Sequence, residues 1–169
     1  ALTRDANADP DRLVRDAEIA LMQAKAAVTR QAAYDKAARE AEDARRKMVR
    51  ALAAGVANDE IFVEYQPILE LATRRVVGVE ALARWCTADG TLVPPLDFIP
   101  VAEANGLIQA ITESVCDQAL AQLAAWDALS SESAGLRLSL NATPNEVGTD
   151  EFIDWLTQLL TTHQVHPSR

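Results

Sequence analysis

Glu80 and Arg84 occupy one face of a segment whose alternating pattern is typical of a β-strand. Leu82 lies between them on that face, whereas the opposite face carries only apolar side chains. A carboxylate and a guanidinium on such a face must be paired, or bound to a ligand or metal, because an unpaired buried charge is costly. The 169-residue sequence therefore contains a candidate catalytic or binding face between Val76 and Trp85.

Two other predicted strands also carry a polar side chain near their C-terminal ends. Gln66 occurs near the end of residues 60–69, on the face opposite Tyr65, and Asn141 ends residues 136–141. In a barrel of parallel strands, polar groups near the carboxyl ends of the strands form the active site. An antiparallel sheet with one face in water would produce the same alternation, so the pattern alone leaves both interpretations open.

The composition is that of an ordinary globular protein of one domain or slightly more. The formal net charge of −9 argues against non-specific binding to a nucleic-acid polymer. No apolar run reaches the roughly 20 residues of a membrane-spanning helix, and the first residues given lack the basic and apolar regions typical of a signal peptide. We therefore expect a cytoplasmic domain. A longer parent protein that contains this domain can still carry a membrane anchor. Cys86 and Cys116 lack the spacing of a zinc site and are expected to be reduced thiols in packed positions.

The apolar pattern predicts two helices before the first strand. The first begins after Asp9, which can cap it, and can stop at residues 28–29. The second covers residues 35–57 and carries many charges, so it is expected to be an exposed linker that ends at Gly55 and Asn58.

The remaining sequence predicts alternating strands and helices. The strands at 60–69 and 75–85 are joined by a short connection, which makes them antiparallel neighbours. The order after the second strand is helix, strand, helix, which indicates parallel strands joined by crossover helices. The expected elements are a helix at 95–105 with Gly106 following its cap, a helix at 107–129, a strand at 136–141, a loop at 142–145 and a helix at 150–163.

Four motifs together resemble the EAL domain of bacterial cyclic di-GMP phosphodiesterases over residues 59–169. They are Tyr65-Gln66-Pro67-Ile68, Glu80-Ala81-Leu82-Ala83-Arg84-Trp85, residues 95–108 and Ser139-Leu140-Asn141. The resemblance implies an α/β fold, namely a partial TIM-like (β/α) barrel whose first strand is antiparallel to the others, preceded by a long helical segment. It also implies metal-dependent hydrolysis of one phosphodiester bond of cyclic di-GMP, which yields the linear dinucleotide.

The resemblance implies roles for five residues. Glu80 and Asn141 match ligands for Mg²⁺ or Mn²⁺, and Gln66 and Glu80 match catalytic positions beside the metal. Gln66, Leu82 and Arg84 match positions that bind the substrate. The chemistry of these side chains supports the same roles independently of the resemblance. Hard divalent cations prefer carboxylate and amide oxygens. A guanidinium can hold a phosphate through two hydrogen bonds.

Structural explanations exist for the same residues. Glu80 and Arg84 can form an ion pair without a ligand. Asn141 can be an ordinary turn residue, and Gln66 can satisfy backbone groups.

Three further residues have two interpretations. Glu103 can belong to the site or be a charge on a helix surface. His163 and His166 have a spacing that allows metal binding, but nothing nearby supplies further ligands, so both are expected to be exposed at a helix end.

The first segment resembles the C-terminal end of a GGDEF (diguanylate cyclase-type) domain. The resemblance rests on residues 1–3, 9–13 and 15–25, although Glu18 and Met22 differ from the usual pattern. We therefore expect a GGDEF-like remnant at 1–34, a helical linker at 35–58 and the N-terminal half of an EAL domain at 59–169.

The expected EAL half ends before the strand that carries the next ligating Glu of the family, and it lacks the acidic pair that holds the metals. The parent protein is expected to be the phosphodiesterase, whereas this chain alone is expected to be incomplete and inactive. A non-catalytic cyclic di-GMP receptor and a protein-interaction module are the alternatives. The expected partners are cyclic di-GMP and an upstream sensor or GGDEF domain in the parent, and a homodimer through the EAL domain or the helical linker fits the same interpretation.

Overall fold

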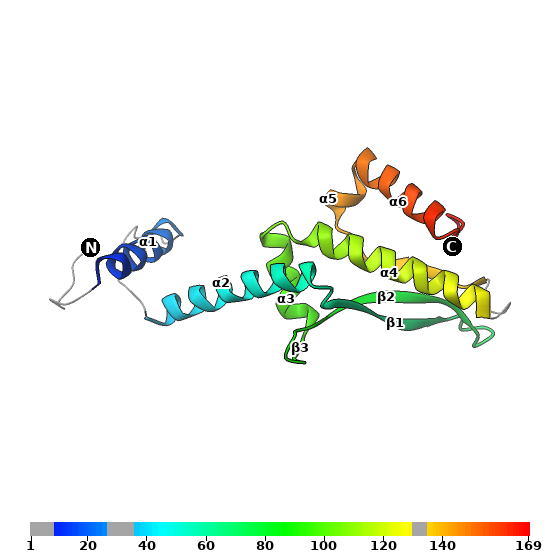
Figure 1. The fold of residues 1–169 in the computed structure, drawn as a ribbon, viewed down its shortest axis with the longest axis horizontal. Helices are drawn as coiled ribbons and strands as arrows, with labels where there is room; N and C mark the ends of the chain where they lie inside the picture. Colours follow the sequence, from blue (N-terminus) through cyan, green and yellow to red (C-terminus); the bar gives the residue numbers. More distant parts are fainter. Residues whose placement is uncertain (1–8, 27–35, 130–134) are drawn as a thin grey trace. The chain divides into compact units, whose positions relative to one another are not determined.

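The structure, a computed structural model, describes residues 9–26, 36–129 and 135–169. The chain divides into two compact units, Ala1–Met48 and Val49–Arg169. In chain order the elements are α1 (Pro10–Ala26), α2 (Lys36–Ala57), β1 (Ile61–Leu69), β2 (Val76–Cys86), β3 (Leu92–Val93), α3 (Pro95–Ala104), α4 (Ile108–Leu129), β4 (Arg137–Leu140), α5 (Pro144–Val147) and α6 (Asp150–Thr162) (Figure 1).

The first unit contains α1 and the beginning of α2. The backbone N–H of Asp11 donates to Oδ1 of Asp9 over 3.2 Å, which confirms the predicted cap. Nη1 of Arg39 lies 3.1 Å from Oδ1 of Asp16, and this ion pair joins the two helices. The predictions for residues 1–3 and 28–29 lie outside the described residues.

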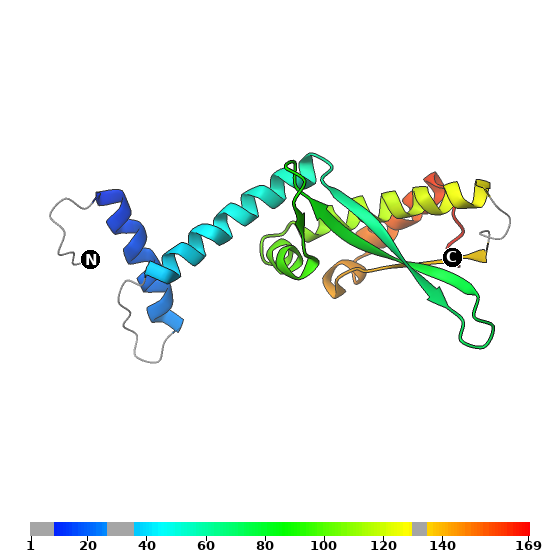
Figure 2. The same cartoon turned by 90° about the horizontal axis from the view of Figure 1, so that it is seen from below.

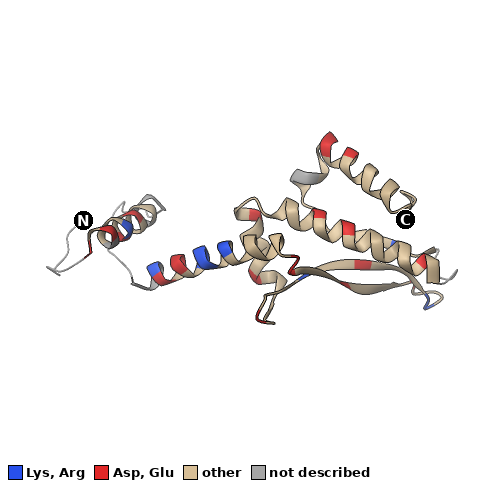
Figure 3. Ribbon diagram, in the orientation of Figure 1, with Lys and Arg blue, Asp and Glu red and all other residues tan. Residues whose placement is uncertain are grey.

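Basic and acidic residues alternate along the N-terminal part of α2 (Figure 3). Nε of Arg46 lies 3.0 Å from Oε1 of Glu42, and Nε of Arg39 lies 3.6 Å from Oδ2 of Asp43. Opposite charges spaced four residues apart give an exposed helix a small stabilisation. This part of α2 is therefore a solvated, charged helix, as the sequence predicts.

The second unit is built on a four-stranded sheet in which β2 pairs with the three other strands. β1 is antiparallel to β2, with Gln66 opposite Glu80, and β4 is parallel to β2, with Ser139 opposite Glu80. Both predictions, the antiparallel hairpin and the parallel strand after it, are confirmed. The two-residue β3 adds an antiparallel pairing at the end of β2 that the sequence did not predict. These strands form an open sheet within a mixed α/β fold, so the described part of the chain contains no closed barrel.

Helix α4 runs along one face of the β1–β2 hairpin (Figures 1 and 2). The side chains of β2 on this face, Val79, Ala81 and Trp85, are buried. Trp85 meets Phe98 of α3 edge-on, with ring centroids 5.8 Å apart. Because a strand alternates its side chains between two faces, this packing sends the polar residues of β2 to the face opposite α4.

Gly55 lies inside α2, which corrects the prediction that it ends the helix. A Cβ atom at Gly55 would lie 2.7 Å from Nε1 of Trp85, so the close approach of helix and ring requires a glycine. The same Nε1 donates to Oε2 of Glu60 over 3.0 Å. Leu52, one turn before Gly55, is fully buried. The sequence predicted an exposed helix, whereas one side of the last turns of α2, which carries Leu52 and Gly55, is buried.

The connections after α3 and β4 follow their turn residues. Gly106 has a φ of 70°, as expected for the residue that follows a helix cap. The sequence predicts a loop at 142–145, whereas α5 begins at Pro144, because proline suits the first position of a helix. Oγ1 of Thr149 then caps α6 by accepting from the N–H of Phe152 over 3.3 Å. Within residues 9–26, 36–129 and 135–169, no helix is both long and apolar enough to cross a membrane.

Candidate functional site

Three neighbouring strands bring the predicted site residues to the sheet face opposite α4. Gln66 in β1 is directly opposite Glu80 in β2, and Asn141 follows the last residue of β4. Leu82 and Arg84 follow Glu80 on the same face of β2. Glu80, Leu82 and Arg84 are half-buried, whereas Gln66 and Asn141 are exposed. The fold therefore gathers residues that are far apart in the sequence.

A hydrogen bond joins Glu80 to Asn141 across the two parallel strands. Nδ2 of Asn141 donates to Oε1 of Glu80 over 2.9 Å. This bond leaves Oε2 of Glu80 and Oδ1 of Asn141 as further acceptors at the ends of adjacent strands. Asn141 is therefore bound to the neighbouring strand and is more than a turn residue.

The oxygen atoms of Glu80 and Asn141 fit a hard divalent cation. Carboxylate and amide oxygens are the ligands that Mg²⁺ and Mn²⁺ prefer, and Mg²⁺ keeps several waters when it binds a protein. The described residues contain no group of three or more His, Cys, Asp or Glu side chains that could hold a metal. Within that part of the chain, the two residues can therefore form only part of a metal site.

Arg84 pairs with Glu64 of β1, and not with Glu80. Nε of Arg84 donates to Oε2 of Glu64 over 2.6 Å, and Nη1 donates to the backbone carbonyl of Ala83 over 2.9 Å. The alternative in which Glu80 and Arg84 form an ion pair is therefore wrong. The sequence did not predict Glu64 as the partner of Arg84, because a diagonal pair depends on the register of the hairpin.

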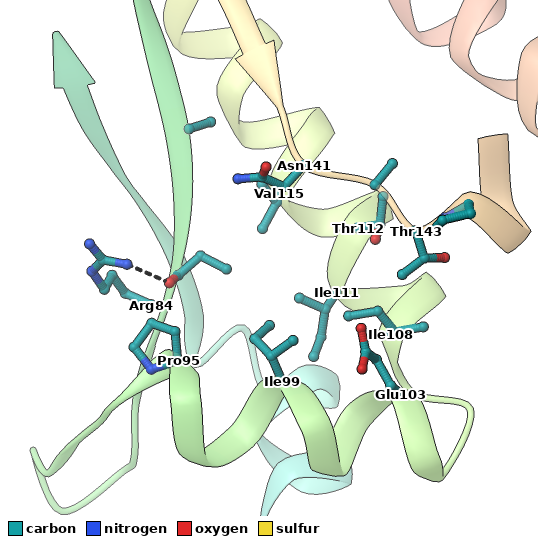
Figure 4. A pocket seen from close by; sticks show the side chains of 14 residues that line it. Arg84, Pro95, Ile99, Glu103, Ile108, Ile111, Thr112, Val115, Asn141 and Thr143 are labelled. Carbon is teal, nitrogen blue, oxygen red and sulfur yellow. Dashed lines mark hydrogen bonds between the residues drawn. The ribbon is translucent and has the colours of Figure 1, made fainter.

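A pocket of about 380 Å³ lies on the α4 side of the sheet, between β2 and the helices α3 and α4 (Figure 4). Apolar side chains form most of its wall, and Arg84, Glu103 and Asn141 are among its polar lining residues. Glu103 is exposed. Figure 4 shows the guanidinium of Arg84 turned back toward the backbone of its own strand. Gln66 and Glu80 do not line this pocket, because they lie on the opposite face of the sheet.

His163 and His166 do not share a site. Nε2 of His163 lies 2.7 Å from Oδ1 of Asp117 in α4, whereas Nδ1 of His166 lies 2.8 Å from Oγ of Ser168. The side chain of His163 is only 17% exposed. This residue therefore links the end of α6 to α4, which corrects the expectation that it is exposed.

The other reactive side chains of the second unit are structural. Cys86 and Cys116 are half-buried and buried respectively, in packed positions as the sequence predicts. Burial raises the pKa of Tyr65 above the ordinary value for a phenol, so its hydroxyl stays protonated near neutral pH. That hydroxyl donates to the carbonyl of Gln118 over 3.5 Å.

Residues 47–169 match the model of the EAL domain family. The chain belongs to this family. Glu80-Ala81-Leu82, at the centre of β2, spell the name of the EAL domain in one-letter code. The EAL residues thus lie on the strand that pairs with the other three strands of the sheet.

Two curated proteins are similar to most of this chain. An uncharacterized signaling protein of Caulobacter vibrioides is 36% identical over 162 residues, which cover 94% of this chain and 19% of that protein. A cyclic di-GMP phosphodiesterase of Pseudomonas aeruginosa is 32% identical over 119 residues, which cover 70% of this chain and 20% of that protein. The chain therefore spans about a fifth of the length of these relatives.

A solved EAL structure agrees with the fold. The PaMucR phosphodiesterase in a c-di-GMP complex superimposes with a TM-score of 0.65 at 29% identity. The match covers 72% of this chain and 49% of that chain. The open sheet described above thus corresponds to a part of a larger EAL structure.

Gly78 allows β4 to approach β2 within the EAL sheet. A Cβ atom at Gly78 would lie 2.7 Å from the backbone carbonyl oxygen of Arg137. A backbone oxygen, unlike the end of a side chain, cannot rotate out of the way. We expect Gly78→Ala to lower the free energy of unfolding of the complete domain by about 2 kcal/mol, because the methyl group forces the strands apart. Urea denaturation followed by tryptophan fluorescence measures the change.

Gly135→Ala is the matched control for this substitution. A Cβ atom at Gly135 meets nothing within 4 Å, so we expect a change within about 0.5 kcal/mol. Equal losses of stability in the two variants would contradict the role assigned to Gly78.

Proposed function

We propose that this chain is part of a phosphodiesterase that hydrolyses cyclic di-GMP to the linear dinucleotide in bacterial second-messenger signalling. The observation that carries the proposal is the 2.9 Å contact between Asn141 and Glu80. This contact supports the proposal, because an amide and a carboxylate so close together on the sheet face of Arg84 would both be within reach of one cation. The names of two similar proteins support the substrate, because one is a cyclic di-GMP phosphodiesterase and the other is a phosphodiesterase in a c-di-GMP complex.

We assign Oε2 of Glu80 and Oδ1 of Asn141 as ligands for Mg²⁺ or Mn²⁺. A divalent cation bound there would make a water molecule more acidic and would offset the negative charge of the phosphodiester. Hydrolysis adds the oxygen of water to phosphorus and breaks one P–O bond, and the departing ribose oxygen takes up a proton. Glu80 would serve this chemistry by holding the cation through its carboxylate.

The remaining site residues bind and orient the substrate. Arg84 presents N–H groups that can hold two phosphate oxygens at once. Gln66, directly opposite Glu80, can donate its amide N–H to a phosphate oxygen or to the attacking water. Leu82 lies between the two charged residues of β2 and offers an apolar surface for a guanine base.

We propose that the complete site belongs to the full-length protein, meaning the longer protein that would carry a whole EAL domain. Purified full-length protein is then expected to convert cyclic di-GMP to the linear dinucleotide in the presence of Mg²⁺ or Mn²⁺, as measured by chromatography of the nucleotides. Absence of turnover with both metals would contradict the proposed activity.

The 169-residue chain by itself is expected to release no linear dinucleotide. The pair Glu80 and Asn141 supplies two oxygen ligands, and an open sheet leaves the opposite side of the site without ligands. The same chromatographic assay with added Mg²⁺ or Mn²⁺ measures this, with the full-length protein as the positive control. Linear product from the chain alone would overturn the assignment of the missing ligands to the rest of the domain.

A non-catalytic cyclic di-GMP receptor is the second candidate function. Arg84, whose side chain is 26% exposed, favours it, because a guanidinium can bind a phosphate without any metal. Isothermal titration of the full-length protein in a chelating agent measures binding without metal. Binding in that experiment, together with no turnover in added Mg²⁺ or Mn²⁺, would select the receptor over the enzyme.

The domain organisation extends the proposal upstream. We propose that residues 1–34 end a GGDEF-like domain, that residues 35–58 form a helical linker and that residues 59–169 begin the EAL domain of a cytoplasmic protein. Similarity to the Caulobacter vibrioides protein covers 94% of this chain and so reaches beyond the EAL match, which supports a shared upstream segment. A homodimer through the EAL domain or the linker is compatible with this arrangement.

A further inference from the structure

We infer that Glu64 is a positioning residue that holds Arg84 in the geometry needed to bind a phosphate group of the ligand. The inference rests on the proposed function, because it concerns the same sheet face. Oε2 of Glu64 accepts from Nε of Arg84 over 2.6 Å, which is a short, charge-assisted hydrogen bond. The side chain of Arg84 is 26% exposed and that of Glu64 is 58% exposed. Arg84 is thus held at the surface of the face where a ligand can reach it.

The two contacts of Arg84 leave part of its guanidinium for a ligand. Nε donates to Glu64, and Nη1 donates to the carbonyl of Ala83 over 2.9 Å. A guanidinium has five N–H donors, so N–H groups on Nη1 and Nη2 remain for two phosphate oxygens. Because the group is already held at two points, it loses little conformational freedom when a ligand binds. Glu64 therefore preorganises the phosphate contact.

The register of the hairpin determines where Glu64 places the guanidinium. Glu64 is opposite Leu82, and Arg84 is opposite Phe62, so the ion pair is diagonal across the two strands. Leu82 lies between Glu80 and Arg84 along β2. The diagonal contact consequently draws the guanidinium back along the strand toward Glu80, where the proposed metal would hold the same phosphate.

Glu64 has a second, opposing effect, because its negative charge offsets the positive charge of Arg84. This effect is weak, since more than half of the Glu64 side chain is exposed and solvent and salt screen its charge. Geometry therefore dominates, and removal of Glu64 weakens the binding of the ligand.

The test compares substitutions at Glu64 in the full-length protein. We expect Glu64→Ala to raise the KM for cyclic di-GMP and the Kd from isothermal titration by about tenfold, with kcat within about twofold, because the contact acts equally in the ground state and the transition state. Glu64→Gln keeps an acceptor oxygen at the same reach and is expected to raise KM by less than about threefold. Glu70→Ala is the matched control, because Glu70 is an exposed carboxylate after β1 whose Oε2 binds Oγ1 of Thr73 over 2.6 Å.

A double-mutant cycle separates positioning from general damage. In an Arg84→Ala background, Glu64→Ala is expected to cause no further rise in Kd, because the group that it positions is absent. An unchanged or lower Kd in Glu64→Ala, or an equal rise in both backgrounds, would overturn the inference. If the unmodified protein neither binds nor hydrolyses cyclic di-GMP, the proposed function fails and the inference fails with it. If the unmodified protein does both and Glu64→Ala behaves identically, the inference alone fails.

Discussion

Glu80→Gln in the full-length protein is expected to reduce the kcat of cyclic di-GMP hydrolysis by about 10³-fold, which corresponds to roughly 4 kcal/mol of lost transition-state stabilisation. The amide removes the negative charge that we propose to hold the cation. It keeps an oxygen that can still accept from Nδ2 of Asn141, so the contact between the strands need not break. Steady-state kinetics with Mg²⁺ or Mn²⁺ measures the loss.

Glu103→Gln is the matched control for this experiment. It makes the same chemical change at an exposed residue of α3 that has no assigned role in catalysis. We expect its kcat to stay within about twofold of the unmodified protein. A Glu80→Gln variant that keeps more than about a tenth of the activity would contradict the assignment of Glu80 as a metal ligand.

Trp85→Ala is expected to lower the free energy of unfolding of the complete domain by about 4 kcal/mol. The Trp85 side chain is 1% exposed, and its ring packs against Phe98. The substitution would leave a cavity between β2, α3 and the end of α2, and it would deprive Oε2 of Glu60 of the donor Nε1. Urea denaturation followed by circular dichroism measures the change.

Trp155→Ala tests whether the location of the tryptophan matters. Trp155 is only half-buried in α6, where its ring lies 5.4 Å from that of Phe152. The same change of side chain is therefore expected to cost less than half as much as at Trp85. Similar costs at both positions would show that Trp85 and α2 do not pack together as described.

The sequence predicted those features of the fold that depend on local pattern. The short connection between β1 and β2 allows only an antiparallel hairpin, and the helical crossover through α3 and α4 between β2 and β4 favours a parallel pairing; both were observed. Alternation along β2 also predicted correctly that Glu80 and Arg84 share a face, since the opposite residues are buried. The bounds of α3, α4 and α6 follow the predicted ranges to within about two residues.

Features that depend on contacts between distant residues could not be predicted. The pairing of Arg84 with Glu64 depends on the exact register of two strands, and composition gives no information on register. Gly55 was interpreted as a helix end because glycine often has that role, whereas its actual reason is the Trp85 ring thirty residues later. The link between His163 and Asp117 likewise exists only after α6 has packed beside α4.

The hairpin has a further consequence for the order in which the site assembles during folding. Gln66, Glu64, Glu80 and Arg84 all lie on β1 and β2, and the Glu64–Arg84 contact spans only 20 residues. Hairpins form in about 1–10 μs because their loop is short. The contact of Asn141 with Glu80 spans 61 residues and must await α3, α4 and the docking of β4. We therefore expect the anion-binding half of the site to exist early in folding, whereas cation affinity appears only when the parallel strand arrives.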